Sequence, residues 1–260
     1  VEPPGLLAPA TADLRVVTNV DYNAKGQRVR IDHGNGVRIS YTYDRRTSRL
    51  TALLTRRDAL AFPDDCPAPQ PPGRPGCQVQ NLHYPYDAAD NVTHIRDTAQ
   101  QTRYFRNRRV DPDNEYTFDA TNRLIEATGR EHLGQIAAPP TPSSYHDRPR
   151  LGILLSAADG NAVARYLERF IYDVAGNLRE IAHVGTDPVS PGWTRAYTYD
   201  EASLLEPLRR SNRLSQTVVG AGPAESYSNA GDGYDAHGNM LRMPHLQVLQ
   251  WDFDDRLRMS

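Results

Sequence analysis

The chain has 260 residues and a formal net charge of −2, with acidic and basic residues interspersed along its length. There is no basic stripe to follow phosphates, which argues against a nucleic-acid partner, and no apolar run is long enough to span a bilayer. The hydrophobic fraction of 38% is low for this length, as expected for sheets that keep one face in water. These properties favour one β-rich architecture without a membrane span.

A short frame recurs along the chain. It consists of an aromatic residue, Asp or Asn, two free positions, and then Gly, Asn or Asp. The five copies are Tyr22-Asn23 with Gly26, Tyr86-Asp87 with Asp90 and Asn91, Phe118-Asp119 with Asn122, Tyr172-Asp173 with Gly176 and Asn177, and Tyr234-Asp235 with Gly238 and Asn239. Five copies with one internal spacing indicate a structural repeat, so the function is sought in an architecture before a catalytic site.

The spacing of the frame is typical of a β-turn. A type I turn favours Asp or Asn at its first position, where the side chain accepts backbone N–H bonds, and a hairpin with a G1 bulge needs a residue that tolerates positive φ at the fourth. Asp173 and Gly176 meet both demands, whereas Asp90 and Asn122 meet the second at a modest cost. The aromatic ring ends the incoming strand and can stack on cross-strand neighbours. Each copy therefore predicts the corner of a β-hairpin.

The flanking segments predict strands. Residues 29–43 alternate apolar and polar on both sides of Asn35-Gly36, the strongest short-range hairpin signal. A second arm leads from an aromatic-Asp pair to an Arg-Leu pair: Tyr43-Asp44 to Arg49-Leu50, Phe118-Asp119 to Arg123-Leu124, and Tyr199-Asp200 to Arg213-Leu214, while Trp251-Asp252-Phe253-Asp254 leads likewise to Arg256-Leu257. No segment has the pattern of an amphipathic helix longer than three turns. The predicted fold class is all-β.

Two stretches interrupt the repeat. The proline-rich insertion at residues 62–80 contains Cys66 and Cys77, which form either a disulfide in an oxidising compartment or two free thiols. A disulfide there would offset about 3 kcal/mol of loop-closure entropy, and two thiols without a nearby histidine pair do not support zinc. Residues 133–165 have four prolines and weak periodicity. They predict a long loop excursion that either packs against a neighbouring part or only covers the surface.

The sequence lacks the motifs of four common enzyme classes, namely the nucleophile elbow, the zinc-protease helix, the P-loop and the dinucleotide fingerprint. We therefore predict no enzymatic activity, no cofactor and no bound metal. Glu131-His132 with Asp97 is interpreted as surface or turn chemistry, and residues 111–115 as a solvated turn in preference to a Ca²⁺ site. The eight histidines are scattered, so both a pH-sensing role and a plain surface role remain open.

Longer segments carry a resemblance to a known family. Residues 91–97, 123–132, 187–195, and 243–246 followed by 251–253, resemble the RHS, or YD-repeat, family, particularly the B and C components of bacterial Tc insecticidal toxin complexes. The resemblance covers nearly the whole chain, from about residue 16 to residue 259. It implies a curled strip of β-hairpins that is a segment of a hollow β-shell, or cocoon.

The resemblance also implies a function and partners. A shell of this kind encapsulates and protects a C-terminal toxin polypeptide before delivery to a target cell. The implied partners are the rest of the RHS shell, the enclosed toxin segment and other toxin-complex subunits such as a pore-forming component, in a secreted or extracellular setting. The alternative is an extracellular YD-repeat binding module that presents aromatic faces to glycans or to a cell-surface protein. Aromatic residues at period two beside the turns favour cross-strand ladders over sugar contacts.

The chain departs from the family pattern in places. Asp90 stands where the repeat has glycine, and residues 201–211 expand one loop. Family members release the toxin by autoproteolysis through aspartates in an Asp-Pro-x-Gly setting, which neither Asp111-Pro112 nor Asp187-Pro188 has, so no cleavage residue is carried over. The chain starts at Val1 without an initiator Met and stops after a repeat arm. We expect a piece of a longer polypeptide.

Overall fold

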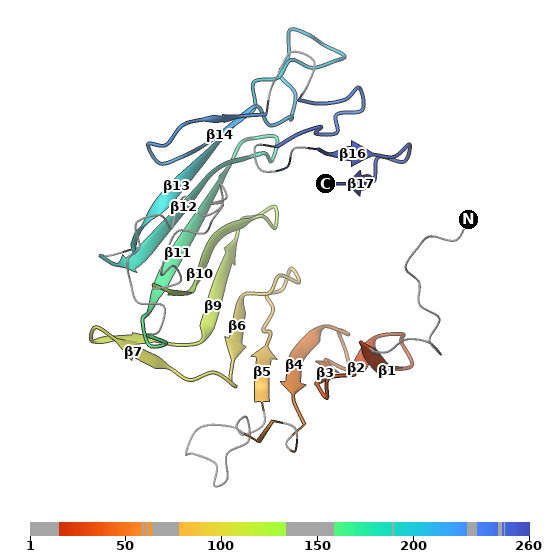
Figure 1. Ribbon diagram of the computed structural model, residues 1–260, viewed down its shortest axis with the longest axis vertical. Helices are drawn as coiled ribbons and strands as arrows, with labels where there is room; N and C mark the ends of the chain where they lie inside the picture. Colours follow the sequence, from red (N-terminus) through yellow and green to blue (C-terminus); the bar gives the residue numbers. More distant parts are fainter. Residues whose placement is uncertain are drawn as a thin grey trace. The chain divides into compact units, whose positions relative to one another are not determined.

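The structure is a computed structural model that describes residues 16–58, 60, 62–63, 78–133, 159–188, 190–227, 233–243, 246 and 248–260. The described residues form strands and turns and contain no α-helix (Figure 1). The predicted all-β fold class is confirmed. Cys66 and Cys77 lie outside the described residues, and so does most of each predicted insertion.

Thirteen strands form one antiparallel sheet in the order β1-β2-β3-β4-β5-β6-β9-β10-β11-β12-β13-β14-β15, and β7-β8 and β16-β17 form two further pairs. The strands are β1 (Val17–Tyr22), β2 (Arg28–His33), β3 (Arg38–Tyr43), β4 (Leu50–Arg56), β5 (Gln78–His83), β6 (His94–Asp97), β7 (Arg103–Phe105), β8 (Arg108–Val110), β9 (Asp113–Phe118), β10 (Leu124–His132), β11 (Val163–Tyr172), β12 (Leu178–Asp187), β13 (Ser190–Thr198), β14 (Gln216–Val219), β15 (Glu225–Ser226), β16 (Gln250–Trp251) and β17 (Leu257–Met259).

Two bounds differ from the ranges expected for the insertions. Strand β5 begins at Gln78, inside the range 62–80. Strand β11 begins at Val163, inside the range 133–165. The last residues of both predicted excursions are therefore paired in the sheet.

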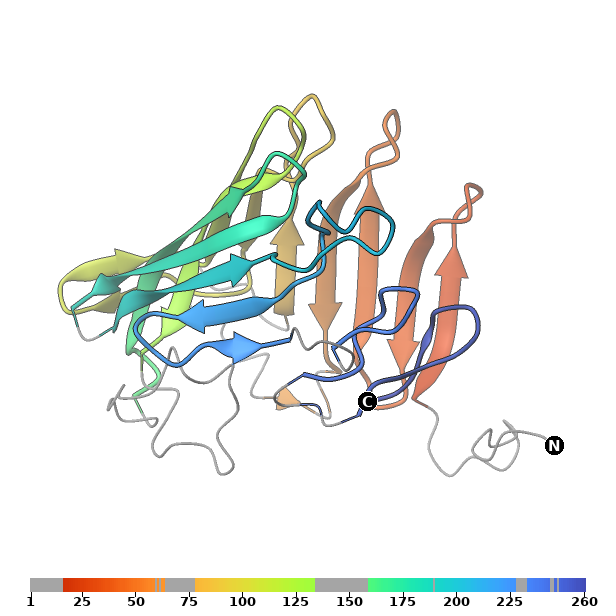
Figure 2. The same cartoon turned by 90° about the horizontal axis from the view of Figure 1, so that it is seen from above.

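The chain divides into two compact units, Val1–Arg103 with Asp111–Tyr116, and Tyr104–Val110 with Thr117–Ser260. In the first unit, β1 to β4 form a meander in which the turns after β1 and β3 lie at the same end of the strands (Figure 2). Successive side chains of a strand point to opposite faces of the sheet. Val20, Ile31 and Ile39 are cross-strand partners and lie on one face of the meander. Asp32 and its cross-strand partners lie on the other face.

The turn between β2 and β3 is centred differently from the sequence expectation. His33 N donates to Val37 O at 2.8 Å and Gly36 N donates to His33 O at 3.1 Å, so Gly34 and Asn35 are the central residues. Gly36 has a φ of 81°, whereas Asn35 stays at negative φ. A two-residue Asn-Gly turn would require positive φ at both positions. The hairpin is present, but its turn has the geometry of the repeat frame.

The second unit contains the longest strands, β10 to β13, of nine or ten residues each. Phe105 from β7 packs against a small buried cluster of Leu133, Ala162 and Ala164. Within the described residues few hydrophobic side chains are buried: Ile31, Val110, Ala127, Leu133, Ala162, Ala164, Tyr227 and Leu249. Contacts between neighbouring strands and turns must therefore supply much of the stability.

Candidate functional site

The turn at Asp173 shows how the repeat frame works. Asp173 N donates to Asn177 O at 2.9 Å, and Gly176 N donates to Asp173 O at 3.1 Å. Oδ1 of Asp173 accepts the backbone N–H of Ala175 and of Asn177, each at 2.9 Å, and Oδ2 accepts Nδ2 of Asn177 at 2.9 Å. The side-chain hydrogen bond from Asn177 leads the interactions that lower the pKa of Asp173. One carboxylate thus satisfies donors that the turn leaves free.

The other predicted copies have the same geometry. The first residue of each turn accepts the backbone N–H groups two and four positions later at Asn23, Asp87, Asp119 and Asp235. The fourth residue of each has positive φ: Gly26 (73°), Asp90 (72°), Asn122 (61°), Gly176 (91°) and Gly238 (91°). Asn91 and Asn239 donate Nδ2 to the carboxylate that opens their turn, each at 3.0 Å. The departure at Asp90 therefore leaves the turn geometry unchanged.

Sequence reasoning missed one turn of this type, at Asp252, and the predicted turn residue Asp44 opens a close variant. Asp252 opens a turn in which Asp255 N donates to Asp252 O at 3.1 Å and Asp255 has a φ of 57°. Its signal was present, because Trp251-Asp252 is followed by Asp255 at the spacing of the frame. Asp44 opens a turn one residue longer, closed by Ser48 with a φ of 64°. In the sequence, only residues 251–254 are interpreted solely as an arm that leads to Arg256-Leu257.

The aromatic residues link each turn to the preceding one through their polar tips. Each donates to the backbone carbonyl of the residue that follows the preceding repeat turn or loop, and we call this set of bonds the turn ladder. Its six bonds are Tyr43 Oη to Arg28 O (2.9 Å), Tyr86 Oη to Leu50 O (2.8 Å), Tyr172 Oη to Leu124 O (2.9 Å), Tyr199 Oη to Leu178 O (3.0 Å), Tyr234 Oη to Leu214 O (2.6 Å) and Trp251 Nε1 to Met240 O (2.7 Å). Phe118 has no hydroxyl to donate, and Tyr22 is 60% exposed.

The arginine of three of the four Arg-Leu pairs has a matching role. Guanidinium groups lie over the next aromatic ring at three places: Arg49 over Tyr86 (5.4 Å), Arg123 over Tyr172 (4.9 Å) and Arg213 over Tyr234 (5.4 Å). In each pair the leucine carbonyl accepts the tyrosine hydroxyl while the neighbouring arginine covers the ring, a cation–π arrangement. This explains why the Arg-Leu pair recurs although the loops before it vary in length.

Asp200 is the one predicted turn residue that does not open a short turn. Residues 201–211 form an excursion in which Ala202 pairs with Arg210, and Arg210 forms an ion pair with Asp200. Asp200 N donates to Ser215 Oγ at 2.6 Å. Tyr199 nevertheless keeps its ladder bond, so the expanded loop leaves the register of the ladder intact.

A buried histidine joins strands β10 to β13 in the second unit. His183 is 8% exposed, and its imidazole is stacked between two aromatic rings. Its ring centroid lies 4.7 Å from that of Tyr166 and 5.3 Å from that of Trp193. Nδ1 lies 3.0 Å from Oε1 of Glu168, and Nε2 lies 3.2 Å from Oε2 of Glu131. Both nitrogens face carboxylates, and only the imidazolium can donate from both. Of the two roles that the sequence left open for the histidines, pH sensing and a plain surface position, the surface position does not apply to His183, which is buried.

The protonation of His183 makes the free energy of unfolding depend on pH. Burial alone lowers the pKa of His183, but hydrogen bonding to Glu131 and Glu168 and their negative charge outweigh it and raise the pKa from 6.5 to about 9. Because the folded pKa exceeds the unfolded one, the stabilisation is complete below pH 6.5 and is lost as the pH rises through about 9. Denaturant unfolding should show a fall of at most about 3 kcal/mol over this range. A His183→Ala variant with the same pH slope as the wild type would contradict the assignment.

The remaining candidate residues do not come together in a common site. Asp113 to Glu115 lie in β9 and not in a solvated turn, and Asp113 lies 3.8 Å from His94. His132 Nε2 lies 2.7 Å from Asp159 O, while Glu131 bonds to His183, so Glu131-His132 forms no acid–base pair with Asp97. Among the residues that the structure describes, no group of three or more His, Cys, Asp or Glu side chains could hold a metal ion.

Comparisons with known proteins show which proteins this chain is similar to. No protein-family model matches the sequence. Toxin subunits YenC1 and YenC2 of Yersinia entomophaga are 32% identical over 240 residues and 30% identical over 247 residues, and the matches cover 91% and 94% of this chain. The chain belongs to the RHS-repeat family of Tc toxin subunits. The resemblance seen in the longer segments is thereby confirmed.

Solved structures of RHS-repeat toxin subunits agree. The crystal structure of TcdB2-TccC3-Cdc42 matches 93% of this chain at 30% identity with a TM-score of 0.56, and that of TcdB2-TccC3 without its hypervariable C-terminal region matches 93% at 29% identity with a TM-score of 0.56. This RHS-repeat chain spans about a fifth of the length of the curated relatives, 21% and 22%, and 10% of the solved chains. No helix in the described ranges is long and apolar enough to cross a bilayer.

The turn ladder of this RHS-repeat chain can be tested at Tyr172. The variant Tyr172→Phe keeps the ring under Arg123 but removes the donor to Leu124 O. We expect the free energy of unfolding to fall by about 1 kcal/mol, because the carbonyl of Leu124 loses the hydroxyl donor that links the two turns. Tyr104→Phe is the matched control, since Tyr104 is 69% exposed and outside the ladder. Equal stability of the two variants in chemical denaturation would show that the ladder bond contributes nothing.

Proposed function

We propose that this chain is a wall segment of an RHS-type shell that encloses and protects a C-terminal toxin polypeptide before delivery to a target cell. In this proposal the chain has no enzymatic activity and no cofactor, and the full polypeptide is secreted. Its partners are the rest of the shell, the enclosed segment and other subunits of the toxin complex, including a pore-forming component. The family membership and the repeat geometry support the proposal.

The turn ladder is the observation that carries the proposal. Neighbouring hairpins of the thirteen-stranded sheet are joined by strand pairing; at six places a polar aromatic tip also bonds to the preceding turn or loop, and at three of these an arginine lies over the ring. Stability that comes mainly from neighbouring repeats allows an architecture to be extended without a thick core. A thin extended sheet with satisfied backbone groups suits a wall that has to separate an interior from proteases outside.

The same contacts weigh against a glycan-binding module. The rings of Tyr86, Tyr172 and Tyr234 are covered by arginine, and their hydroxyl groups are already donated to backbone carbonyls. Sugar stacking needs a free aromatic face. We expect no saturable binding on a glycan array, and binding that is lost in Tyr104→Ala, which removes an exposed ring, would favour the module.

Electron cryo-microscopy of the full-length polypeptide would test the wall directly. The expected result is that the hairpins of this chain continue into flanking repeats and line a cavity that contains further protein density. Repeats that form a filled rod or an isolated sheet, with the C-terminal segment outside, would contradict the proposal.

A further inference from the structure

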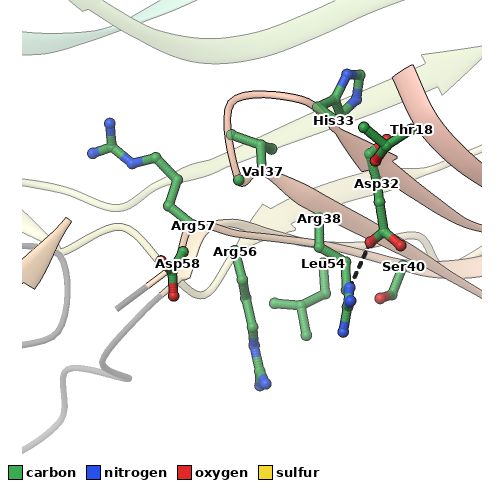
Figure 3. Close-up of a pocket in the computed structure, with 11 residues that line it drawn as sticks. Thr18, Asp32, His33, Val37, Arg38, Ser40, Leu54, Arg56, Arg57 and Asp58 are labelled. Carbon is green, nitrogen blue, oxygen red and sulfur yellow. Dashed lines mark hydrogen bonds and ion pairs between the residues drawn. The ribbon is translucent and has the colours of Figure 1, made fainter. Parts of the chain in front are cut away.

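A groove of about 680 Å³ lies in the first unit, over strands β1 to β4. Its lining includes Asp32 from β2, Arg38 and Ser40 from β3, and Leu54 and Arg56 from β4 (Figure 3). A Cβ at Gly36 would lie 3.4 Å from Cβ of Asp58, so Asp58 lies against the tip of the β2–β3 hairpin. The volume is within the range of pockets that hold ligands.

Two arginines stand directly opposite each other in this groove. Arg38 and Arg56 are cross-strand partners in β3 and β4, so their side chains leave the same face of the sheet. Figure 3 shows them extending in the same direction, while Arg57 points elsewhere. Like charges at directly opposite positions destabilise an antiparallel pair. The pair therefore favours a ligand that brings negative charge between the two guanidinium groups.

The surrounding carboxylates leave this charge only partly compensated. Asp32 is shared, since its Oδ1 lies 2.6 Å from Nε of Arg38 and its Oδ2 lies 2.5 Å from Nη2 of Arg30. These hydrogen bonds, first from Arg30 and then from Arg38, lower the pKa of Asp32 to about 2, so it stays ionised. The guanidinium of Arg56 has no ion pair or hydrogen bond within the described residues, and its neighbour on β5 is the uncharged Gln78.

The groove also contains other titratable groups. Asp58 and Arg57 both line it, and each already has an interaction. His33 lines it as well, and its Nε2 is buried without a hydrogen-bond partner in the described part of the chain. Among Asp32, Asp58, Arg38, Arg56 and Arg57 the formal charge is positive by one.

We propose that the groove is an oxyanion-binding site in which a carboxylate or phosphate group bridges Arg38 and Arg56. Arg38 donates Nε to Asp32, and its two terminal nitrogens can donate to the ligand. All the guanidinium nitrogens of Arg56, which form a planar fork, can donate to it. Two guanidinium groups on one face suit the paired oxygens of such an anion. The site is independent of the wall function, because it requires only the β1 to β4 meander.

The site is tested by isothermal titration calorimetry on the full-length polypeptide with two probes, inorganic phosphate and an acetylated, amidated tetraglutamate peptide. Arg56→Gln is the test variant and Arg45→Gln the matched control, because Arg45 is an exposed turn residue outside the groove. We expect one saturable site, weakened at least tenfold by Arg56→Gln and unchanged by Arg45→Gln. The bound anion should also raise the thermal unfolding temperature of the control but not of Arg56→Gln.

The two probes distinguish the source of the oxyanion. Binding of phosphate supports a free-anion ligand, and binding of the peptide alone supports the carboxylates of a polypeptide segment. Arg56→Lys, which keeps the charge but loses the fork, should bind with intermediate affinity. The proposal is overturned by the absence of saturable binding of either probe, or by equal weakening in Arg56→Gln and Arg45→Gln.

Discussion

Replacing His183 with alanine is expected to reduce the free energy of unfolding by about 3 kcal/mol. The variant removes an imidazolium that lies between Tyr166 and Trp193 and that bonds to Glu131 and Glu168. The two carboxylates would then face each other without a counter-charge. The side chains of Glu131 and Glu168 are 22% and 26% exposed, so solvent weakens the repulsion between them. The loss of stability should therefore lie at the low end of the range known for breaking a buried ion pair.

His237→Ala is the matched control for this experiment. His237 also bonds to a carboxylate, with Nδ1 2.8 Å from Asp255, but its side chain is 62% exposed. Its removal should not change the denaturation midpoint measurably, because an exposed pair contributes little. If both histidine variants lost the same stability, the buried cluster would have no special role in holding β10 to β13 together.

The second large effect is expected at Gly192. The residue has a φ of 110°, and a Cβ there would lie 1.9 Å from the carbonyl oxygen of His183. Since the three nearest atoms all belong to the backbone of His183 and Val184, the clash can be relieved only by separating β12 from β13, where Gly192 pairs with Val184. Gly192→Ala should therefore cost at least about 3 kcal/mol, combining backbone strain with overpacking.

Gly160→Ala provides the comparison for the Gly192 variant. Nothing lies within 4 Å of a Cβ at Gly160, and its φ is not positive. Its thermal unfolding should stay close to that of the wild type, as for most surface substitutions. A Gly192→Ala protein that melts together with Gly160→Ala would mean that β12 and β13 approach less closely than described.

The repeat turns could be predicted because their determinants are local. An Asp at the first position and a residue tolerant of positive φ at the fourth specify the turn within five residues. Even Asp90 and Asn122, which lack the glycine, adopt φ values of 72° and 61°. The same local rule covers the turn at Asp252, which was missed only because Asp255 was not recognised as the fourth residue.

The contacts between repeats could not be predicted in the same way. Tyr172 and its acceptor Leu124 are 48 residues apart, and Glu131 and His183 are 52 residues apart. Such pairs depend on strand order and register, which the frame does not specify. The recurring Arg-Leu pair was a usable signal, but its meaning requires knowing that the next hairpin lies beside it.

The segment at residues 187–195 illustrates the difference between resemblance and explanation. Its similarity to Tc-type sequences was recognisable in the sequence. The structure supplies the physical reason, because Gly192 permits the close approach of β13 to His183 and Trp193 stacks on the imidazole at 5.3 Å. Only long-range pairing places these residues together.

Limited proteolysis with mass spectrometry of the natural full-length polypeptide tests the central claim most directly. A wall segment predicts that the C-terminal segment co-migrates with the repeats and resists protease until denaturant opens the shell. Gly192→Ala should shift the loss of protection to lower denaturant, and Gly160→Ala should not. Immediate digestion of the C-terminal segment in the native wild-type protein would contradict the enclosing role.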